Sequence, residues 1–139
     1  MYDFHYNFVL PKYDKNCKLM YMDTDCFIYE LKCKNFYKDV KKNLNLFDTS
    51  DYPKNNKYKI PLINKKTVGK FKDECAGNII TEFVGIRSKM YSLRVEGIDN
   101  IKKAKGIKNY IVNNKIDFDD YYDCLKNNTL QFREQCCVR

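Results

Sequence analysis

The chain has 139 residues, a formal net charge of +8 and a sequence pI near 9.0, with twelve tyrosines and nine phenylalanines. This length and aromatic content supply a hydrophobic core and exclude a disordered chain, so we expect one compact unit. No apolar run approaches the roughly 20 residues that span a bilayer, which excludes a transmembrane protein and predicts a soluble, intracellular one. The positive charge favours a polyanionic partner, either nucleic acid or an anionic membrane surface.

The first ten residues place apolar and aromatic side chains at helical spacing on two faces. This pattern predicts a mostly buried helix that ends at Pro11. Its single histidine, His5, lies among aromatic residues and far from paired cysteines, so we interpret it as a helix histidine with a satisfied hydrogen bond and not as a zinc ligand.

Two short apolar runs follow, at residues 19–22 and 26–31, and they predict a β-hairpin buried on both faces. Asn35 is the expected cap of a helix that reaches about Leu46. The region 48–66 carries prolines, asparagines and lysines with little periodicity, which predicts an exposed crossing loop.

The C-terminal half predicts short strands and a final helix. Strands are expected at residues 67–73, 79–86, 89–95 and 101–105, and one antiparallel sheet is the economical arrangement for them. Asp117 is placed to cap a helix that reaches about Lys126, with Ile116 stapled onto Tyr121. The tail from residue 131 to 139 shows no pattern, and we expect it to fray.

The seven cysteines are odd in number and show no C-x-x-C spacing. We therefore interpret them as reduced thiols. They are Cys17, Cys26, Cys33, Cys75, Cys124, Cys136 and Cys137.

An acidic triplet, Asp23-Thr24-Asp25, separates the two strands of the expected hairpin. Strand alternation predicts that Asp23 and Asp25 point to one side of the hairpin tip while Thr24 points away. Two carboxylates that close repel each other unless a cation lies between them, and Mg²⁺ suits hard oxygen ligands. The alternative interpretation is a simple polar turn.

The sequence around the triplet, Y-M-D-T-D-C at residues 21–26, resembles motif C (Y-x-D-T-D-S) of family B DNA polymerases, with a cysteine where serine is usual. The resemblance implies that Asp25 is the principal metal ligand. Asp23 is the second catalytic carboxylate and assists at the metal or the triphosphate, and Tyr21 and Thr24 support the pair. The implied cofactor is Mg²⁺ or Mn²⁺ in a two-ion site.

A second resemblance lies at residues 87–91, R-S-K-M-Y, which is similar to the K-x-Y motif of the same family. It implies that Lys89 and Tyr91 approach the primer terminus, and strand alternation predicts that they share one face. The alternative is a packed tyrosine in an alternating strand beside a solvated lysine.

A third resemblance lies at residues 102–106, K-K-A-K-G, which is similar to a stretch near the passage from palm to thumb in protein-primed family B polymerases of the viral and Maverick type. It implies that Lys102, Lys103 and Lys105 neutralise duplex phosphates without reading sequence. A solvated basic strand is the alternative.

Together the resemblances imply an α+β fold, with an antiparallel palm sheet, a catalytic β-hairpin, flanking helices and the beginning of a helical thumb. They place a partial palm at residues 1–107 and the start of the thumb with a frayed tail at residues 108–139. The implied function is template-directed DNA synthesis by a DNA-directed DNA polymerase. The implied partners are a DNA primer-template, dNTP and, in this subgroup, a terminal protein primer, with no membrane partner.

Two upstream motifs of the family, D-x-x-S-L-Y-P and K-x-x-x-N-S-x-Y-G, are missing from the sequence. The stretch 47–53 imitates the first, but its spacing and its position along the chain are wrong. We therefore expect a fragment with little activity alone, whose two-ion site is completed by a carboxylate outside this chain. A gene remnant, a partial gene model and one piece of a split enzyme all fit this expectation.

Two other classes stay open at this point. One is a non-catalytic basic module that binds nucleic acid through Lys89 and residues 102–108. The other is an inert α+β protein, or a degenerate remnant, with an accidental acidic turn.

Overall fold

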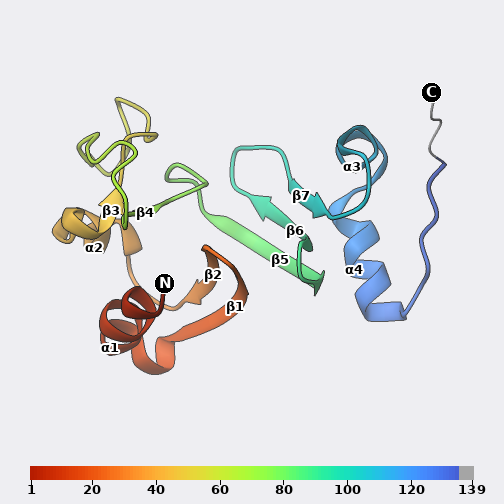
Figure 1. Ribbon diagram of the computed structural model, residues 1–139, viewed down its shortest axis with the longest axis horizontal. Coiled ribbons are helices and arrows are strands. Elements are labelled where there is room, and N and C mark those ends of the chain that lie inside the picture. Colours follow the sequence, from red (N-terminus) through yellow and green to blue (C-terminus); the bar gives the residue numbers. More distant parts are fainter. Residues whose placement is uncertain (135–139) are drawn as a thin grey trace. The chain divides into compact units, whose positions relative to one another are not determined.

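The computed structural model describes residues 1–134, and it divides into two compact units, Met1–Gly77 and Asn78–Arg139 (Figure 1). The expectation of one compact unit is therefore wrong. The predicted α+β class is confirmed, because helices accompany an antiparallel hairpin and an antiparallel three-stranded sheet. The predicted boundary between palm and thumb after residue 107 stays a prediction, and it falls inside the second unit.

The first unit begins with a π-helix, η1 (Phe4–Val9), which continues into the helix α1 (Leu10–Tyr13) and the 3₁₀ turn η2 (Asp14–Asn16). The prediction that Pro11 ends the helix is wrong. Pro11 lies in the first turn of α1, where its missing N–H and its fixed φ are tolerated.

The N-terminal helical segment is amphipathic and not mostly buried as predicted. Phe4, Val9 and Tyr13 are buried, whereas Tyr2 and Tyr6 are 71% and 58% exposed. His5 confirms its predicted role, because its Nδ1 lies 2.8 Å from the hydroxyl of Tyr29.

The predicted hairpin is confirmed as β1 (Cys17–Asp23) paired antiparallel with β2 (Cys26–Leu31). The prediction that the hairpin is buried on both faces is wrong, because Ile28 is the one residue of the two strands that is buried. The pairing of Asp23 with Cys26 leaves a two-residue loop between the strands.

The helix predicted after Asn35 is confirmed as α2 (Phe36–Lys42), and the Asn35 side chain accepts a hydrogen bond from the Lys38 N–H at 3.3 Å. It ends before Leu46, because Asn43 leaves the helical backbone region and a 3₁₀ turn, η3 (Leu44–Leu46), follows.

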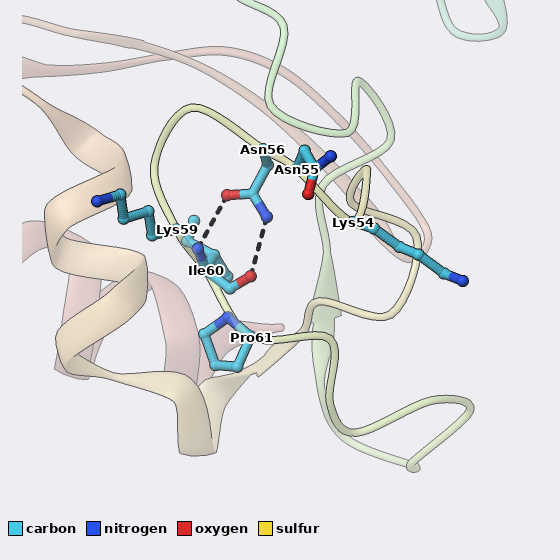
Figure 2. Close-up of a pocket in the computed structure, with 6 residues that line it drawn as sticks. All are labelled: Lys54, Asn55, Asn56, Lys59, Ile60 and Pro61. Carbon is cyan, nitrogen blue, oxygen red and sulfur yellow. Dashed lines mark hydrogen bonds between the residues drawn. The ribbon is translucent and has the colours of Figure 1, made fainter.

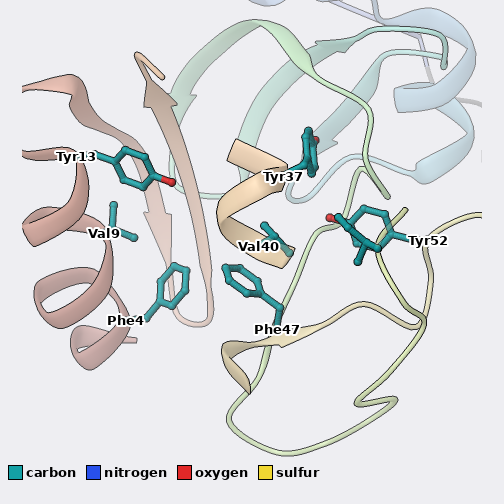
Figure 3. Packing of buried hydrophobic residues seen from close by; sticks show 8 residues of the cluster. Phe4, Val9, Tyr13, Tyr37, Val40, Phe47 and Tyr52 are labelled. Atoms are coloured by element: carbon teal, nitrogen blue, oxygen red, sulfur yellow. The ribbon is translucent and has the colours of Figure 1, made fainter. Parts of the chain in front are cut away.

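An aromatic core holds the first unit together, and Figure 3 shows its side chains converging from the N-terminal helices, α2 and the segments that follow. The rings of Phe4 and Phe71 stack with centroids 4.0 Å apart, and those of Tyr37 and Tyr58 stack at 3.9 Å. The buried members are Phe4, Val9, Tyr13, Tyr37, Val40, Phe47, Tyr52 and Ile60.

The crossing loop at residues 48–66 is not exposed throughout as predicted. Thr49, Tyr52 and Ile60 are buried at 1%, 5% and 3% exposure. The Thr49 hydroxyl donates to the carbonyl of Pro61 at 2.6 Å and accepts from the Ile63 N–H at 3.3 Å, so the loop is fastened where it crosses the core.

Two predictions about the strands differ from the structure: the strand expected at residues 67–73 is shorter, and the four expected strands do not share one sheet. The first is reduced to β4 (Phe71–Lys72), which pairs in parallel with β3 (Phe47–Asp48) inside the first unit. The second unit holds β5 (Ile80–Arg87), β6 (Met90–Val95) and β7 (Ile101–Ala104) in one antiparallel sheet in that order.

Two helices follow this sheet (Figure 1). The helix α3 (Asn109–Lys115) was not predicted, while α4 (Phe118–Asn127) confirms the predicted N-cap. Asp117 and Asp120 form a reciprocal capping box. A cluster of Val84, Phe118 and Tyr121, with Ile116 packed against it, joins α4 to the sheet.

The tail is anchored at one point where fraying was predicted. The Arg133 guanidinium donates to the carbonyl of Lys115 at 2.7 Å and pairs with Asp120 at 2.7 Å. The rest of the predicted frayed segment, residues 135–139, lies outside the described residues.

The five cysteines in the described part of the chain are free thiols, as predicted, and Cys136 and Cys137 lie outside it. Among residues 1–134, no helix has the length and apolar character needed to cross a membrane.

Candidate metal and nucleic-acid site

The hairpin loop carries the predicted carboxylate pair. Asp23 ends β1 and is half-buried, whereas Asp25 is exposed in the loop. The strand-alternation argument is wrong here, because Thr24 and Asp25 form the turn and Thr24 has a φ of 27°. The loop therefore places the two carboxylates two residues apart at the tip, but period-two geometry does not set their directions.

Asp23 is held by its neighbours. Its carboxylate accepts a hydrogen bond from the hydroxyl of Tyr21 at 3.3 Å and another from the hydroxyl of Thr24 at 3.1 Å. These bonds orient Asp23 and give Tyr21 and Thr24 a supporting position, with Thr24 beside Asp23 and not pointing away from it. Asp25 is the more accessible of the two carboxylates.

A third carboxylate, that of Glu74, acts electrostatically on Cys26 at the start of β2. The pKa of the Cys26 thiol is raised by burial first, and then by the negative charges of Asp25, Glu74 and Asp23. Glu74 is exposed and lies just after β4, and it was missed because it is far from Cys26 along the chain. No sequence pattern links these two positions.

The donor set fits half of a divalent-ion site. Two carboxylates supply the hard oxygen ligands that Mg²⁺ and Mn²⁺ prefer. Within the part of the chain that the structure describes, no three His, Cys, Asp or Glu residues are grouped so that they could hold an ion. Asp23 and Asp25 can therefore contribute ligands but do not form a complete site among these residues.

The predicted primer contacts lie in the second unit, and their geometry differs from the prediction. Lys89 lies in the turn between β5 and β6 with a φ of 58°, so β6 begins at Met90 and strand alternation does not relate Lys89 to Tyr91. Tyr91 is half-buried, with its ring centroid 6.3 Å from that of Phe83. Their roles at a primer stay predictions.

Gly85 makes room for the Phe83 ring. A Cβ at Gly85 would come within 2.7 Å of the Phe83 ring, and Gly85 is the β5 partner of Tyr91. A side chain at this position is therefore incompatible with the observed placement of Phe83.

The three predicted phosphate-binding lysines do not form one group. Lys102 is buried to 10% side-chain exposure, and its ammonium donates to the carbonyls of Asn113 at 3.0 Å and Ile116 at 2.7 Å. It satisfies carbonyls at the end of α3, which is a structural role. Lys103 and Lys105 are exposed.

A shallow pocket of about 450 Å³ lies in the crossing loop, and Figure 2 shows its lining. The Asn56 amide closes the loop by donating to the Ile60 carbonyl at 2.9 Å and accepting from the Ile60 N–H at 2.8 Å. The Lys54 and Lys59 side chains extend away from each other, so they do not converge on a common ligand.

The fold and the hairpin define an α+β protein with an exposed acidic loop and a basic three-stranded sheet. Comparisons with known protein families, with curated proteins and with solved structures found no match.

Proposed function

We propose that this chain is a palm segment of a DNA-directed DNA polymerase, in which Asp25 and Asp23 contribute ligands to a two-ion site for nucleotidyl transfer. The observation that carries the proposal is the two-residue loop of the β1–β2 hairpin, which presents Asp25 to solvent beside Asp23. The resemblance of residues 21–26 to motif C gives this loop its proposed role.

The proposed division of labour follows from burial and hydrogen bonding. Asp25 is exposed, so it can approach an ion or a triphosphate without further rearrangement of the strands. Asp23 is oriented by Tyr21 and Thr24, which fixes one carboxylate while the other stays accessible. When bound, a divalent-ion pair activates the primer 3′ oxygen and neutralises the leaving group.

The same reasoning proposes that the isolated chain has little catalytic activity. Two carboxylates leave most positions of an octahedral ion to water or substrate, and the family's third carboxylate belongs to a motif that this sequence lacks. DNA, dNTP and a terminal protein are the partners proposed for the complete enzyme.

Metal binding tests the proposal without requiring activity. Mn²⁺ is titrated into the wild-type chain and into Asp25→Asn, with primer-template present, and free Mn²⁺ is followed by electron paramagnetic resonance. We expect Asp25→Asn to weaken binding by about tenfold or more, because one charged ligand is lost.

Glu30→Gln is the matched control, because Glu30 is an exposed carboxylate on β2 of the same hairpin. It should bind Mn²⁺ like wild type. Identical binding by wild type and Asp25→Asn would remove the metal-site proposal. A metal-independent interaction with DNA would then favour the basic nucleic-acid-binding module.

A further inference from the structure

Part of the crossing loop in the first unit combines lysines with exposed aliphatic side chains. Val68 is 96% exposed, and Leu62 and Ile63 are 41% and 38% exposed. Lys65 and Lys66 lie between them in the sequence and are also exposed. We call this group of five residues, Leu62, Ile63, Lys65, Lys66 and Val68, the loop face.

The loop face has a positive charge. Segment 52–72 contains several lysines and no acidic residue. The acids that precede this segment are bound to other groups. Asp48 is 9% exposed and accepts the Lys66 backbone N–H at 3.0 Å, and Asp51 pairs with Lys72.

Hydrogen bonds on the inner side of the loop hold its backbone in place. The Asn64 amide donates to the carbonyls of Leu44 at 2.8 Å and Phe47 at 2.9 Å. Asn64 and Lys66 have φ angles of 62° and 56°, left-handed values that persist in non-glycine residues where surrounding contacts impose them. Backbone strain of this kind is concentrated at binding sites. The loop face is therefore preformed and needs no ordering when it meets a partner.

The composition of residues 59–70 distinguishes between partners with negative charge. This stretch has no aromatic residue and no arginine. Protein interfaces are enriched in aromatic residues and arginine and depleted in lysine, and single-stranded nucleic acids are bound by cations together with aromatic rings that stack on the bases. An anionic bilayer takes aliphatic side chains into the boundary between headgroups and acyl chains, while lysines contact the headgroups.

We propose that the loop face docks peripherally on an anionic phospholipid bilayer. Val68 and Leu62 enter the interface, and Lys65 and Lys66 contact lipid phosphates and carboxylates. This inference goes beyond the proposed function and departs from the expectation, implied by the resemblance alone, that the chain has no membrane partner. Peripheral docking of this kind needs no membrane-spanning helix.

A single tryptophan reports the docking directly, because the chain contains none. Val68→Trp is mixed with vesicles of phosphatidylcholine that contain about 30% phosphatidylserine, and with vesicles of phosphatidylcholine alone. We expect the indole emission to move to shorter wavelength with the anionic vesicles and to stay unchanged with the neutral ones.

Co-sedimentation with the same vesicles separates the two contributions. Lys65→Gln/Lys66→Gln should lower the partition coefficient for anionic vesicles by roughly tenfold or more, because two cations leave the surface. Leu62→Ser/Val68→Ser should lower it by about tenfold, because less apolar surface enters the interface.

Matched controls come from the second unit. Lys103→Gln/Lys105→Gln removes the same charge from exposed positions, and Leu130→Ser/Phe132→Ser removes two apolar side chains that are each 83% exposed. Both controls should keep the wild-type partition coefficient.

Three results would overturn the inference. They are unchanged emission of Val68→Trp with anionic vesicles, losses in the control variants as large as those in the loop-face variants, and the same emission shift when duplex DNA replaces the vesicles. The last result would assign the loop face to nucleic acid. None of these measurements involves Asp25, so their outcome is independent of the Mn²⁺ titration.

Discussion

Replacement of Lys102 by methionine tests whether this lysine is structural. Its ammonium makes two charge-assisted hydrogen bonds, to the carbonyls of Asn113 and Ile116, and its side chain is 10% exposed. Its contact with Asp117 is longer, at 3.7 Å, and that carboxylate is 81% exposed, so the ion pair contributes little.

The magnitude follows from these contacts. A hydrogen bond to a charged group is worth about 1.5–3 kcal/mol. Asn113 is exposed, and water can replace the lysine at its carbonyl, so we take the lower part of the range and expect a total loss of about 2–3 kcal/mol. Local opening of α3 should then become roughly 30- to 150-fold more frequent.

Hydrogen–deuterium exchange, resolved by peptide, measures this local opening. In Lys102→Met the amides of α3 and of the first turn of α4 should exchange faster by that factor. Lys103→Met is the control, because Lys103 is exposed and its effect should stay within about 0.5 kcal/mol. An exchange rate in α3 of Lys102→Met within about threefold of wild type would refute the structural assignment.

Three further predictions concern the first unit. Burial opposes ionisation of Asp39, but the Tyr13 hydrogen bond and the Lys12 ammonium outweigh burial and lower the pKa of Asp39 below 3.8. In urea unfolding, wild type should therefore be more stable than Asp39→Asn. This advantage should be full above pH 4 and should shrink as the pH falls through the lowered pKa. Thr49→Val keeps the shape of the side chain but leaves two backbone partners in the crossing loop unpaired. Thermal or urea unfolding should therefore show that the free energy of unfolding falls by about 2 kcal/mol. An unchanged free energy of unfolding would mean that water replaces the hydroxyl. Burial first, and then nearby carboxylates, raise the pKa of the Cys75 thiol to about 11. Mass spectrometry after iodoacetamide treatment at pH 8 should therefore find the exposed Cys33 alkylated well before Cys75. Similar alkylation rates for the two thiols would contradict the buried placement of Cys75.

Local sequence signals predicted the elements whose formation depends on near neighbours. The Asn35 cap, the Asp117 capping box and the hairpin at residues 17–31 all follow from side chains within a few positions of each other. The helix α3 was missed because it is short and ends in asparagine and lysine, so its buried residues are too few to show a period.

Long-range contacts explain the larger errors. Residues 48–66 have the composition of an exposed loop, yet Thr49 and Tyr52 are buried because the loop crosses an aromatic core that forms only in the folded unit. The short β4 pairs in parallel with β3 across more than twenty intervening residues, and no local pattern distinguishes that partner from an antiparallel one. Glu74 was missed near the hairpin tip for the same reason.

The candidate site shows where period-two reasoning ends. It predicts side-chain directions only for residues in strands, and both the acidic and the basic motif have a proposed site residue in a turn: Asp25 between β1 and β2, and Lys89 between β5 and β6. In each hairpin the neighbouring strand residue, Asp23 or Tyr91, is held by local contacts, while the turn residue is exposed. A fixed residue beside an accessible one suits a site whose geometry is completed by a ligand or by further protein. This is why metal affinity, and not activity of the isolated chain, is the decisive measurement for Asp25.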